Sequence, residues 1–390
     1  MLDVAIVGGG IQGVHMAHVL KSGVGVHRNR MTVIDPHPSL AMRWTVRTSR
    51  VGFDHLRSTL VHHVGLAAGD LANAGMASKA QDFAPPYQQP SLRLFNAHVR
   101  STIEQSELDA CHCVAAALQV RRHQAAFRIE TSRGPLEARR VILALGPAEP
   151  AIPAWARDPA LSARVDHVFN PTIPDHLLRP PREGERVLIV GGGMTAVQLS
   201  LRMARHAPSA VTLVSHRSPP VKQFDSDAGW MGPRFLDDFG RLASPRERRI
   251  RISTGRNRGS ITAAVAKALR SAVAAQVLVH RVGNVQSAEP CADGVMVRFE
   301  NGNDTLTADR IILATGFGNV RPGGVLLDDL IRCYQLPIAA CGYPLVNDEL
   351  EWAPRLHVMG NLAELKLGPA AANLPGARMA ASAIASALVS

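Results

Sequence analysis

The sequence predicts an α/β protein made of two related units with parallel sheets, the second unit being inserted into the first. The first observation is a repeat, because VAIVGGGIQGVHM at 4–16 returns about 180 residues later as VLIVGGGMTAVQL at 187–199. Each copy has an apolar strand, a glycine turn, a helical run and a second apolar strand, as a βαβ unit does. Proline-rich segments at 144–155 and 179–185 then separate the two copies.

The elements follow in order along the chain. In the first copy we expect a strand at 4–7, a helix at 11–23 and a second strand at 31–35. In the second copy we expect a strand at 186–190, a helix at 194–207 and a second strand at 210–217. The segment 310–324 reads as a further apolar strand and a loop, and 356–388 as a short strand, a loop and a long helix. The chain therefore returns to its first unit near its end.

Composition narrows the class of protein. Apolar residues make up 46% and aromatic residues 4%, so the core is built from small aliphatic side chains, which suits α/β layers. The net charge is +11, but the densest basic run, at 244–260, has no interleaved aromatics, which argues against nucleic-acid binding. That run is either a solvated face or a positive rim that attracts anionic cofactors. With five cysteines, no CxxC, no leader and no membrane span expected, a cytoplasmic protein is predicted.

The first glycine turn has the G-x-G-x-x-G pattern of a Rossmann dinucleotide site. Gly8 allows the tight turn, Gly10 lets the backbone approach a pyrophosphate, and Gly13 lets helix and strand pack closely. The pyrophosphate then lies on the helix N-terminus, where free amides and the helix dipole favour anions. Asp35 ends the next strand about 20 residues further on, where a carboxylate accepts from both hydroxyls of a ribose.

The second glycine turn differs from the first in two ways. Gly191 and Gly193 keep the first two glycines, but Ala196 replaces the third, and no acid ends the following strand. Arg217 stands there instead, and an arginine pairs with a 2′-phosphate that a carboxylate would repel. This favours NADPH over NADH.

Two dinucleotide sites in one chain indicate hydride transfer between two cofactors. The N-terminal site, with its acid, suits a resident FAD, and the second site a mobile NADPH. We therefore expect an FAD-binding domain at 1–155, an NAD(P)H-binding domain at 156–315 and a return segment of the FAD domain at 316–390. Gly146 and Gly316 end the strands that cross between the domains, and we expect them to let the backbone approach the cofactors.

The chain resembles the flavoproteins with two dinucleotide-binding domains, and among them the flavin-containing and the lysine and ornithine N-hydroxylating monooxygenases. The resemblance rests on GGGIQG with Asp35, ALGPAEPAIP at 144–153, GGGMTA with Arg217, and ATGF at 314–317, which includes Thr315. Stretches at 56–63, 222–239 and 360–378 extend it over nearly the whole chain. Gly360-Asn361 stands where many relatives have a Gly-Asp pair that meets the flavin. No CxxC is present for disulfide chemistry, and no metal site is expected.

The resemblance implies that NADPH reduces FAD and that the reduced flavin adds oxygen at C4a. The resulting hydroperoxide passes one oxygen atom to a nucleophile, here a small amine or a similar group. The resemblance and the loop positions together give the candidate catalytic residues, which are Arg57, Ser58, His62, His63, Gln223, Asp225 and Asn373. Asn373 opens the last helix, whose positive end would face the flavin.

Two other functions stay open at this stage. The first is an NAD(P)H-flavin oxidoreductase that passes electrons to an acceptor or to oxygen without inserting an oxygen atom. The second is a non-catalytic, FAD-binding redox sensor. The expected partners are a small-molecule substrate and molecular oxygen, without nucleic acid or membrane, and a homo-oligomer is left open.

Overall fold

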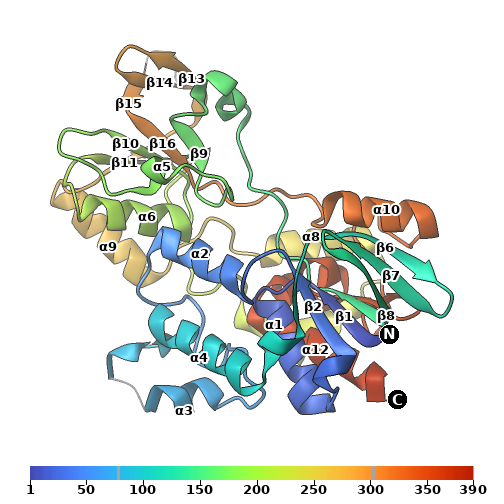
Figure 1. Cartoon of the computed structure of the whole chain (residues 1–390). Coiled ribbons are helices and arrows are strands. Elements are labelled where there is room, and N and C mark those ends of the chain that lie inside the picture. Colours follow the sequence, from blue (N-terminus) through green and yellow to red (C-terminus); the bar gives the residue numbers. More distant parts are fainter. Residues whose placement is uncertain (77–79, 301–303, 390) are drawn as a thin grey trace.

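The computed structural model describes residues 1–76, 80–300 and 304–389, and it has two largely parallel sheets in separate halves of the molecule (Figure 1). The first sheet has the order β17-β18-β8-β1-β2-β5, with β17 (Glu351–Ala353), β18 (Leu356–Val358), β8 (Gly134–Leu143), β1 (Leu2–Val7), β2 (Met31–Asp35) and β5 (His112–Val114). The second sheet has the order β12-β11-β10-β16-β9, with β12 (Val279–Val282), β11 (Val211–Ser215), β10 (Val187–Val190), β16 (Arg310–Leu313) and β9 (Val165–His167). The first sheet contains strands that precede the second sheet in the sequence and strands that follow it. The predicted α/β class with an inserted second unit is confirmed, whereas the limits at 155 and 315 stay a prediction.

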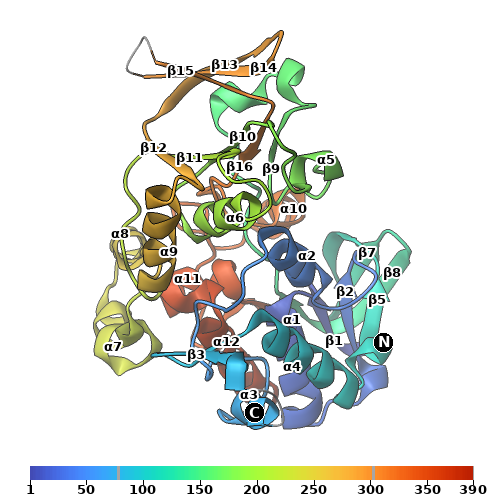
Figure 2. The same ribbon diagram turned by 90° about the vertical axis from the view of Figure 1, so that its left-hand side faces the viewer.

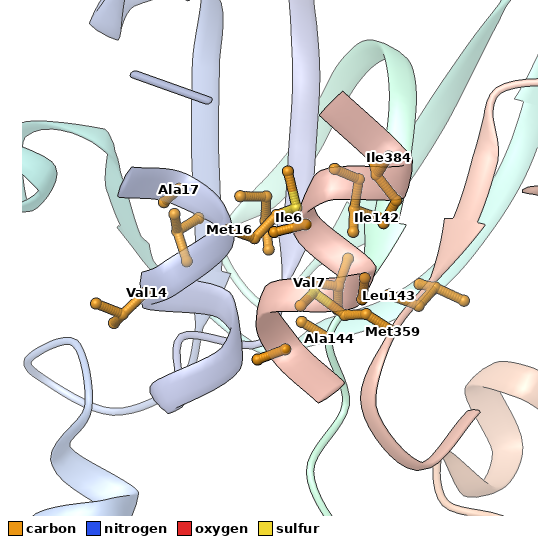
Figure 3. Close-up of a cluster of buried hydrophobic side chains, with 14 of the residues drawn as sticks. Ile6, Val7, Val14, Met16, Ala17, Ile142, Leu143, Ala144, Met359 and Ile384 are labelled. Atoms are coloured by element: carbon orange, nitrogen blue, oxygen red, sulfur yellow. The ribbon is translucent and has the colours of Figure 1, made fainter. Parts of the chain in front are cut away.

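The central strands are apolar because helices cover both faces of each parallel sheet. In β1, Val4, Ala5 and Ile6 are completely buried, and the strand pairs in parallel with β2 and β8. Figure 3 shows Ile6 and Ile142 of this sheet beside α1 (Ile11–His18) and α12 (Leu374–Val389). The last helix of the chain therefore packs against the first, and it closes the core of the first unit.

The remaining elements fill the surfaces around the two sheets. The first unit contains α2 (Met42–Val51), α3 (Asp70–Met76), α4 (Leu92–Gln105), α10 (Gly324–Tyr334), α11 (Glu364–Leu367), the hairpin of β6 (Ala117–His123) and β7 (Ala126–Thr131), and the pair β3 (Phe83–Ala84) and β4 (Gln89–Pro90). The second contains α5 (Asp175–Leu178), α6 (Met194–Ala204), α9 (Ala263–Ala274) and a small sheet of β13 (Val285–Cys291), β14 (Gly294–Phe299) and β15 (Thr305–Ala308). The helices α7 (Pro233–Arg241) and α8 (Pro245–Gly255) pack with α11 of the first unit. Figure 2 shows α8 near α11, which it contacts.

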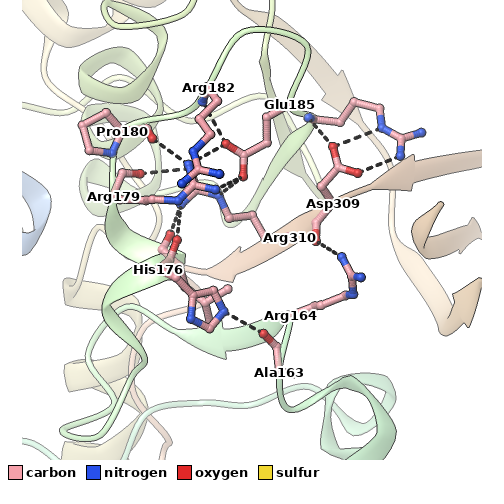
Figure 4. A network of polar contacts seen from close by, with 11 residues as sticks. Ala163, Arg164, His176, Arg179, Pro180, Arg182, Glu185, Asp309 and Arg310 are labelled. Atoms are coloured by element: carbon pink, nitrogen blue, oxygen red, sulfur yellow. Dashed lines mark hydrogen bonds and ion pairs between the residues drawn. The ribbon is translucent and has the colours of Figure 1, made fainter.

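A buried arginine fixes the connection that leads into the second sheet. Arg310, at the start of β16, is 2% exposed, and its Nε lies 3.0 Å from Glu185 Oε1 (Figure 4). The same guanidinium donates to the backbone carbonyls of His176, Leu177 and Arg179, at the end of α5. Burial lowers the pKa of Arg310. The segment just before the second glycine turn is thus held against the sheet by one side chain.

Two elements differ toward their C-terminal ends from what the sequence predicts. The helix expected over 11–23 is regular only to His18 and continues as a wider π-helical segment over Val19–Val24. The strand expected over 210–217 ends at Ser215, so Arg217 lies in the loop that follows rather than at the strand end. No helix among the described residues is both long and apolar enough to cross a membrane.

Candidate functional site

The first glycine turn is shaped by close backbone contacts at two of its three glycines. A Cβ on Gly8, whose φ is +111°, would lie 2.5 Å from the carbonyl oxygen of Ala144. A Cβ on Gly13 would lie 1.8 Å from the carbonyl oxygen of Gly8, so α1 touches the turn through this position. A Cβ on Gly10 would meet no atom within 4 Å. The helix N-terminus therefore faces open space, as a pyrophosphate site requires.

Asp35 lies beside this turn at the end of β2. Its Oδ2 accepts from the backbone N–H of Gly9 at 2.7 Å, and its Oδ1 accepts from the N–H of His37 at 3.0 Å. The Nδ1 atom of His37 lies 2.7 Å from the same Oδ1. A carboxylate has about four acceptor positions, so Asp35 keeps capacity for ribose hydroxyls. The turn and the carboxylate fit the adenosine diphosphate half of FAD.

The second turn is built the same way but is packed less tightly. A Cβ on Gly191 would lie 2.3 Å from the carbonyl oxygen of Ala314 and 3.0 Å from the Cβ of Ala196. Ala196 is completely buried, so α6 stands far enough from the turn to admit a methyl group where Gly13 admits none. Arg217 is exposed, and its backbone oxygen accepts from Ser215 Oγ at 2.9 Å. A dinucleotide with a 2′-phosphate fits this turn.

Three other predicted cofactor residues, Gly146, Thr315 and Gly316, lie on the two chain segments that connect the units. Thr315 Oγ1 donates to Ala151 O at 2.5 Å, and Gly316 O accepts from Ala151 N at 2.9 Å. These bonds pair the outgoing chain with the returning one. Gly146, on the outgoing chain, faces the guanidinium of Arg43, which lies 3.7 Å from where its Cβ would be.

Gly360 and Asn361 follow β18 and lie beside the first glycine turn. The φ of Gly360 is +68°, and a Cβ there would lie 2.4 Å from Gln12 Oε1. Gln12 Nε2 in turn donates to Ala371 O at 3.1 Å. Gln12, in the first turn of α1, therefore links the glycine turn to the segment before α12.

The structure brings Arg57, Gln223 and Asp225 together, although the first is more than 160 residues from the others. Arg57 donates through Nε to Gln223 O at 2.8 Å and through Nη1 to Asp225 Oδ1 at 2.5 Å. Its Nη2 donates to the carbonyls of Lys222 and Phe224, and to Ser260 Oγ at 2.8 Å. Burial lowers the pKa of Arg57, and Asp225 opposes that shift. Arg57 thus supports a loop of the second unit from the first.

Gln223 carries a buried group that the described residues leave unpaired. Its side-chain Nε2 is buried and has no hydrogen-bond acceptor among them. A buried N–H without an acceptor costs about 1 to 3 kcal/mol. The Nε2 atom is shielded from solvent, so the assignment of Gln223 to the site stays a prediction.

The two candidate histidines differ in their surroundings. His63 is completely buried, its Nδ1 accepts from Gly65 N at 3.1 Å, and its Nε2 lies 3.1 Å from Ala68 O. His63 therefore ties its own loop together. Burial, followed by His63 and Arg378, lowers the pKa of His62 to about 4. A neutral imidazole of that basicity offers hydrogen bonds but is a weak proton acceptor near neutral pH.

Ser58 is half-buried in the same loop, and Asn373 directly precedes α12. The backbone oxygen of Asn373 accepts from Ala377 N at 2.9 Å, so the residue begins the helix as expected. Ser58 and Asn373 thus lie on different segments of the first unit, and their assignment to the site stays a prediction.

Sequence reasoning missed an ion cluster and an aromatic contact between the units. Glu364 of α11 is 1% exposed and pairs with Arg249 of α8 and with Arg256. The Arg47 guanidinium lies 4.9 Å from the ring centre of Phe317 and 5.5 Å from that of Phe169, two rings that stack on each other. Burial lowers the pKa of Arg47 to about 10. The arginine run at 244–260 was the only sequence signal for the ion cluster.

The cysteines and metal-binding side chains give no further site. All five cysteines are free, and Cys111 is buried, which raises the pKa of its thiol. Among residues 1–76, 80–300 and 304–389, no group of three or more His, Cys, Asp or Glu side chains is arranged to hold a metal ion.

Known proteins resemble the chain in fold over its whole length. The Kutzneria sp. 744 ornithine N-hydroxylase is 17% identical, with a TM-score of 0.79 over 100% of this chain and 99% of that one. The ornithine hydroxylase of Pseudomonas aeruginosa, in its reduced form, is 16% identical, with a TM-score of 0.76 over 100% and 98%. The L-lysine 6-monooxygenase of Pseudomonas syringae is 18% identical, with a TM-score of 0.72 over 100% and 99%. No curated protein matches the chain in sequence.

The family model described as pyridine nucleotide-disulphide oxidoreductase matches residues 2–232. The match includes both glycine turns, Asp35 and Arg217, and it spans more than half of the chain. The family is one of oxidoreductases that bind FAD and a pyridine nucleotide, so the predicted class of enzyme and its cofactors are confirmed. The chain therefore belongs to the pyridine nucleotide-disulphide oxidoreductase family.

Proposed function

We propose that the protein is an FAD-dependent, NADPH-consuming monooxygenase that hydroxylates the nitrogen of a small aliphatic amine. The observation that carries the proposal is the full-length likeness of both units to N-hydroxylating monooxygenases. A cadaverine monooxygenase of Erwinia amylovora also matches, with a TM-score of 0.77 over 98% of this chain and 93% of that one. Ornithine, lysine and cadaverine share a primary amine at the end of an unbranched chain, and we propose the same substrate class here.

The cysteines support an acceptor other than a protein disulfide. Cys111 and Cys113 are the only cysteines within three residues of each other, and both lie at β5, the edge strand of the first sheet. Cys111 Sγ donates to Arg28 O at 3.7 Å, and its raised pKa keeps it a thiol. The chemistry that gives the family its name is therefore not the one we assign to this chain.

The two units would divide the work of the reaction. Bound FAD supplies hydride acceptance and oxygen activation. In the first unit, Asp35 would orient the ribose, and the amides at the start of α1 would hold the pyrophosphate. In the second, Arg217 would pair with the 2′-phosphate of NADPH, and the loop of Gln223, which accepts from Arg57, would lie beside the nicotinamide. The residues of this chain thus bind and orient, as is expected where the cofactor carries the chemistry.

The test measures product against NADPH consumed. The purified protein, loaded with FAD, is incubated with NADPH and ornithine, lysine, cadaverine or putrescine, and both hydroxylamine and hydrogen peroxide are quantified. A monooxygenase gives hydroxylamine nearly equal to the NADPH consumed with at least one of these amines. Peroxide or a reduced acceptor in place of hydroxylamine would instead indicate an oxidoreductase that inserts no oxygen atom. A protein that binds no FAD would contradict the assignment at its first step.

A further inference from the structure

The segment 256–260 crosses the N-terminus of α6, at the second glycine turn. It connects α8, which ends at Gly255, to α9, which begins at Ala263. The Cα of Gly259 lies 3.5 Å from where a Cβ on Gly193 would be. We call residues 256–260 the strap, because they lie across the site expected to hold the pyridine nucleotide.

The strap is fastened to the first unit at its beginning. Arg256 Nη2 donates to Glu364 Oε2, and Arg256 Nε donates to Pro369 O at 3.3 Å. Glu364 is 1% exposed and pairs with Arg249 as well, so its carboxylate is fully engaged by cations. A buried carboxylate paired in this way holds its partners in one geometry. The start of the strap is therefore held to α11 and to the segment that follows it.

The strap is fastened to the first unit again at its end. Ser260 is 2% exposed, and its Oγ accepts from Arg57 Nη2 at 2.8 Å. Arg57 also donates to the carbonyls of the loop 222–225, and this loop accepts from Asn257 of the strap, through Asp225 O at 2.6 Å and Phe224 O at 2.9 Å. Arg57 thus holds the end of the strap and the Gln223 loop in one arrangement.

Between the two fastenings, the strap presents a cation. Arg258 is exposed, and its Nη1 donates to Asn319 Oδ1 in the chain that returns from β16. The next residue, Gly259, has a φ of +69°, and a Cβ there would face open space. Arg258 thus directly precedes the glycine that lies against the turn, and an arginine close to a helix N-terminus would add a charged donor to its free amides, which suits a diphosphate.

We infer that the strap is a fixed wall of the pyridine nucleotide site, with Arg57 and Glu364 as its positioning residues and Arg258 facing the diphosphate. The inference rests on the proposed use of NADPH, and it adds a role for the first unit in binding that nucleotide. Because both fastenings come from the first unit, the nucleotide affinity of the second unit depends on side chains outside it.

The test compares two arginines that both join the units. Arg57→Gln removes the fastening at the end of the strap, whereas Arg50→Gln removes bonds from α2 to the carbonyls of Val168, Asn170 and Pro171, none of which belongs to the strap. Two measurements are made on the FAD-loaded proteins. One is the dissociation constant of NADP⁺ by calorimetry, and the other is the rate of tryptic cleavage after Arg258, followed by mass spectrometry.

For Arg57→Gln we expect the dissociation constant of NADP⁺ and the cleavage rate after Arg258 each to rise about tenfold, with FAD content unchanged. In the wild type, NADP⁺ should slow that cleavage, and Arg50→Gln should behave like the wild type. Equal effects of the two variants would overturn the inference, because Arg57 would then act only as a general contact between units. Should Arg57→Gln fail to fold, Ser260→Ala, which removes one of its acceptors, is measured in the same way.

The failure of the proposed function is distinguishable from the failure of this inference. A wild-type protein that binds no NADP⁺ contradicts both. A wild-type protein that binds NADP⁺ normally, with an Arg57→Gln variant of equal affinity and equal resistance to trypsin, contradicts the strap alone.

Discussion

The packing at Gly13 makes a sharp prediction about the first cofactor site. Gly13→Ala places a Cβ 1.8 Å from the carbonyl oxygen of Gly8, which is far inside the contact distance of a carbon and an oxygen. This oxygen belongs to the backbone and cannot rotate away, so α1 must move away from the turn by more than about 1 Å to restore an ordinary carbon–oxygen contact. Overpacking of this kind typically costs about 1 to 3 kcal/mol, and a backbone clash belongs at the upper end.

Gly10→Ala is the matched control, because its Cβ meets no atom within 4 Å. We expect Gly13→Ala to lower the melting temperature of the FAD-free protein and to lose FAD on gel filtration. Gly10→Ala should keep the melting temperature and weaken only FAD binding, since its methyl group points into the space before the helix. Differential scanning fluorimetry measures the melting temperature, and the ratio of flavin absorbance to protein absorbance after gel filtration measures the bound FAD. A Gly13→Ala protein that melts and binds FAD like the wild type would refute this account of the turn.

Three further predictions follow from the charges. Arg217→Ala should raise the KM for NADPH about tenfold and leave the KM for NADH unchanged, because only NADPH carries a 2′-phosphate. Arg205→Ala, at an exposed site at the C-terminal end of α6, should change neither KM. Equal losses of affinity for both nucleotides would count against a contact between Arg217 and the 2′-phosphate. Arg310→Ala should lower the free energy of unfolding by about 1 to 3 kcal/mol, because three backbone carbonyls lose a buried donor while Glu185 keeps its pair with Arg179. Arg186→Ala, at the more exposed pair with Asp309, should cost less than about 1 kcal/mol in urea titrations. Burial lowers the pKa values of four histidines from 6.5 to about 4, and these are His15, His62, His98 and His167. Their contribution to stability is present above pH 6.5 and is lost as the pH falls toward 4, because the folded protein holds them neutral. A melting temperature that stays constant between pH 7 and 4.5 would contradict this.

The parts of the site that the sequence predicted are those set by short-range geometry. The two glycine turns lie between a strand and a helix, and Asp35 ends β2, because spacing within one βαβ unit determines these positions. Arg217 lies two residues beyond β11, because the strand ends at Ser215 and not at 217 as the sequence predicted. Local spacing thus locates each half of a nucleotide site but not what lies across from it.

The parts that the sequence did not predict depend on contacts between distant segments. Arg57 was chosen as a candidate for the flavin site, and the structure gives its guanidinium five acceptors in the second unit. Glu364 and Arg256 are 108 residues apart, and no periodic pattern connects them. The sequence of an arginine-rich run does not show whether its guanidinium groups lie in water or pair with a buried acid. The basic segment at 244–260 therefore suggested only a solvated face or a positive rim.

The way the arginines are used accounts for part of the net charge of +11. Several of them donate mainly to backbone carbonyls, which bind a guanidinium without neutralising it. The clearest cases are Arg50, Arg57, Arg248, Arg310 and Arg378. Arg50 and Arg57 join the two units, and Arg248 reaches from α8 to Leu365 of α11. A positive excess of this origin needs no polyanionic partner. Arginine serves to join segments in this way because one side chain reaches several carbonyls at once.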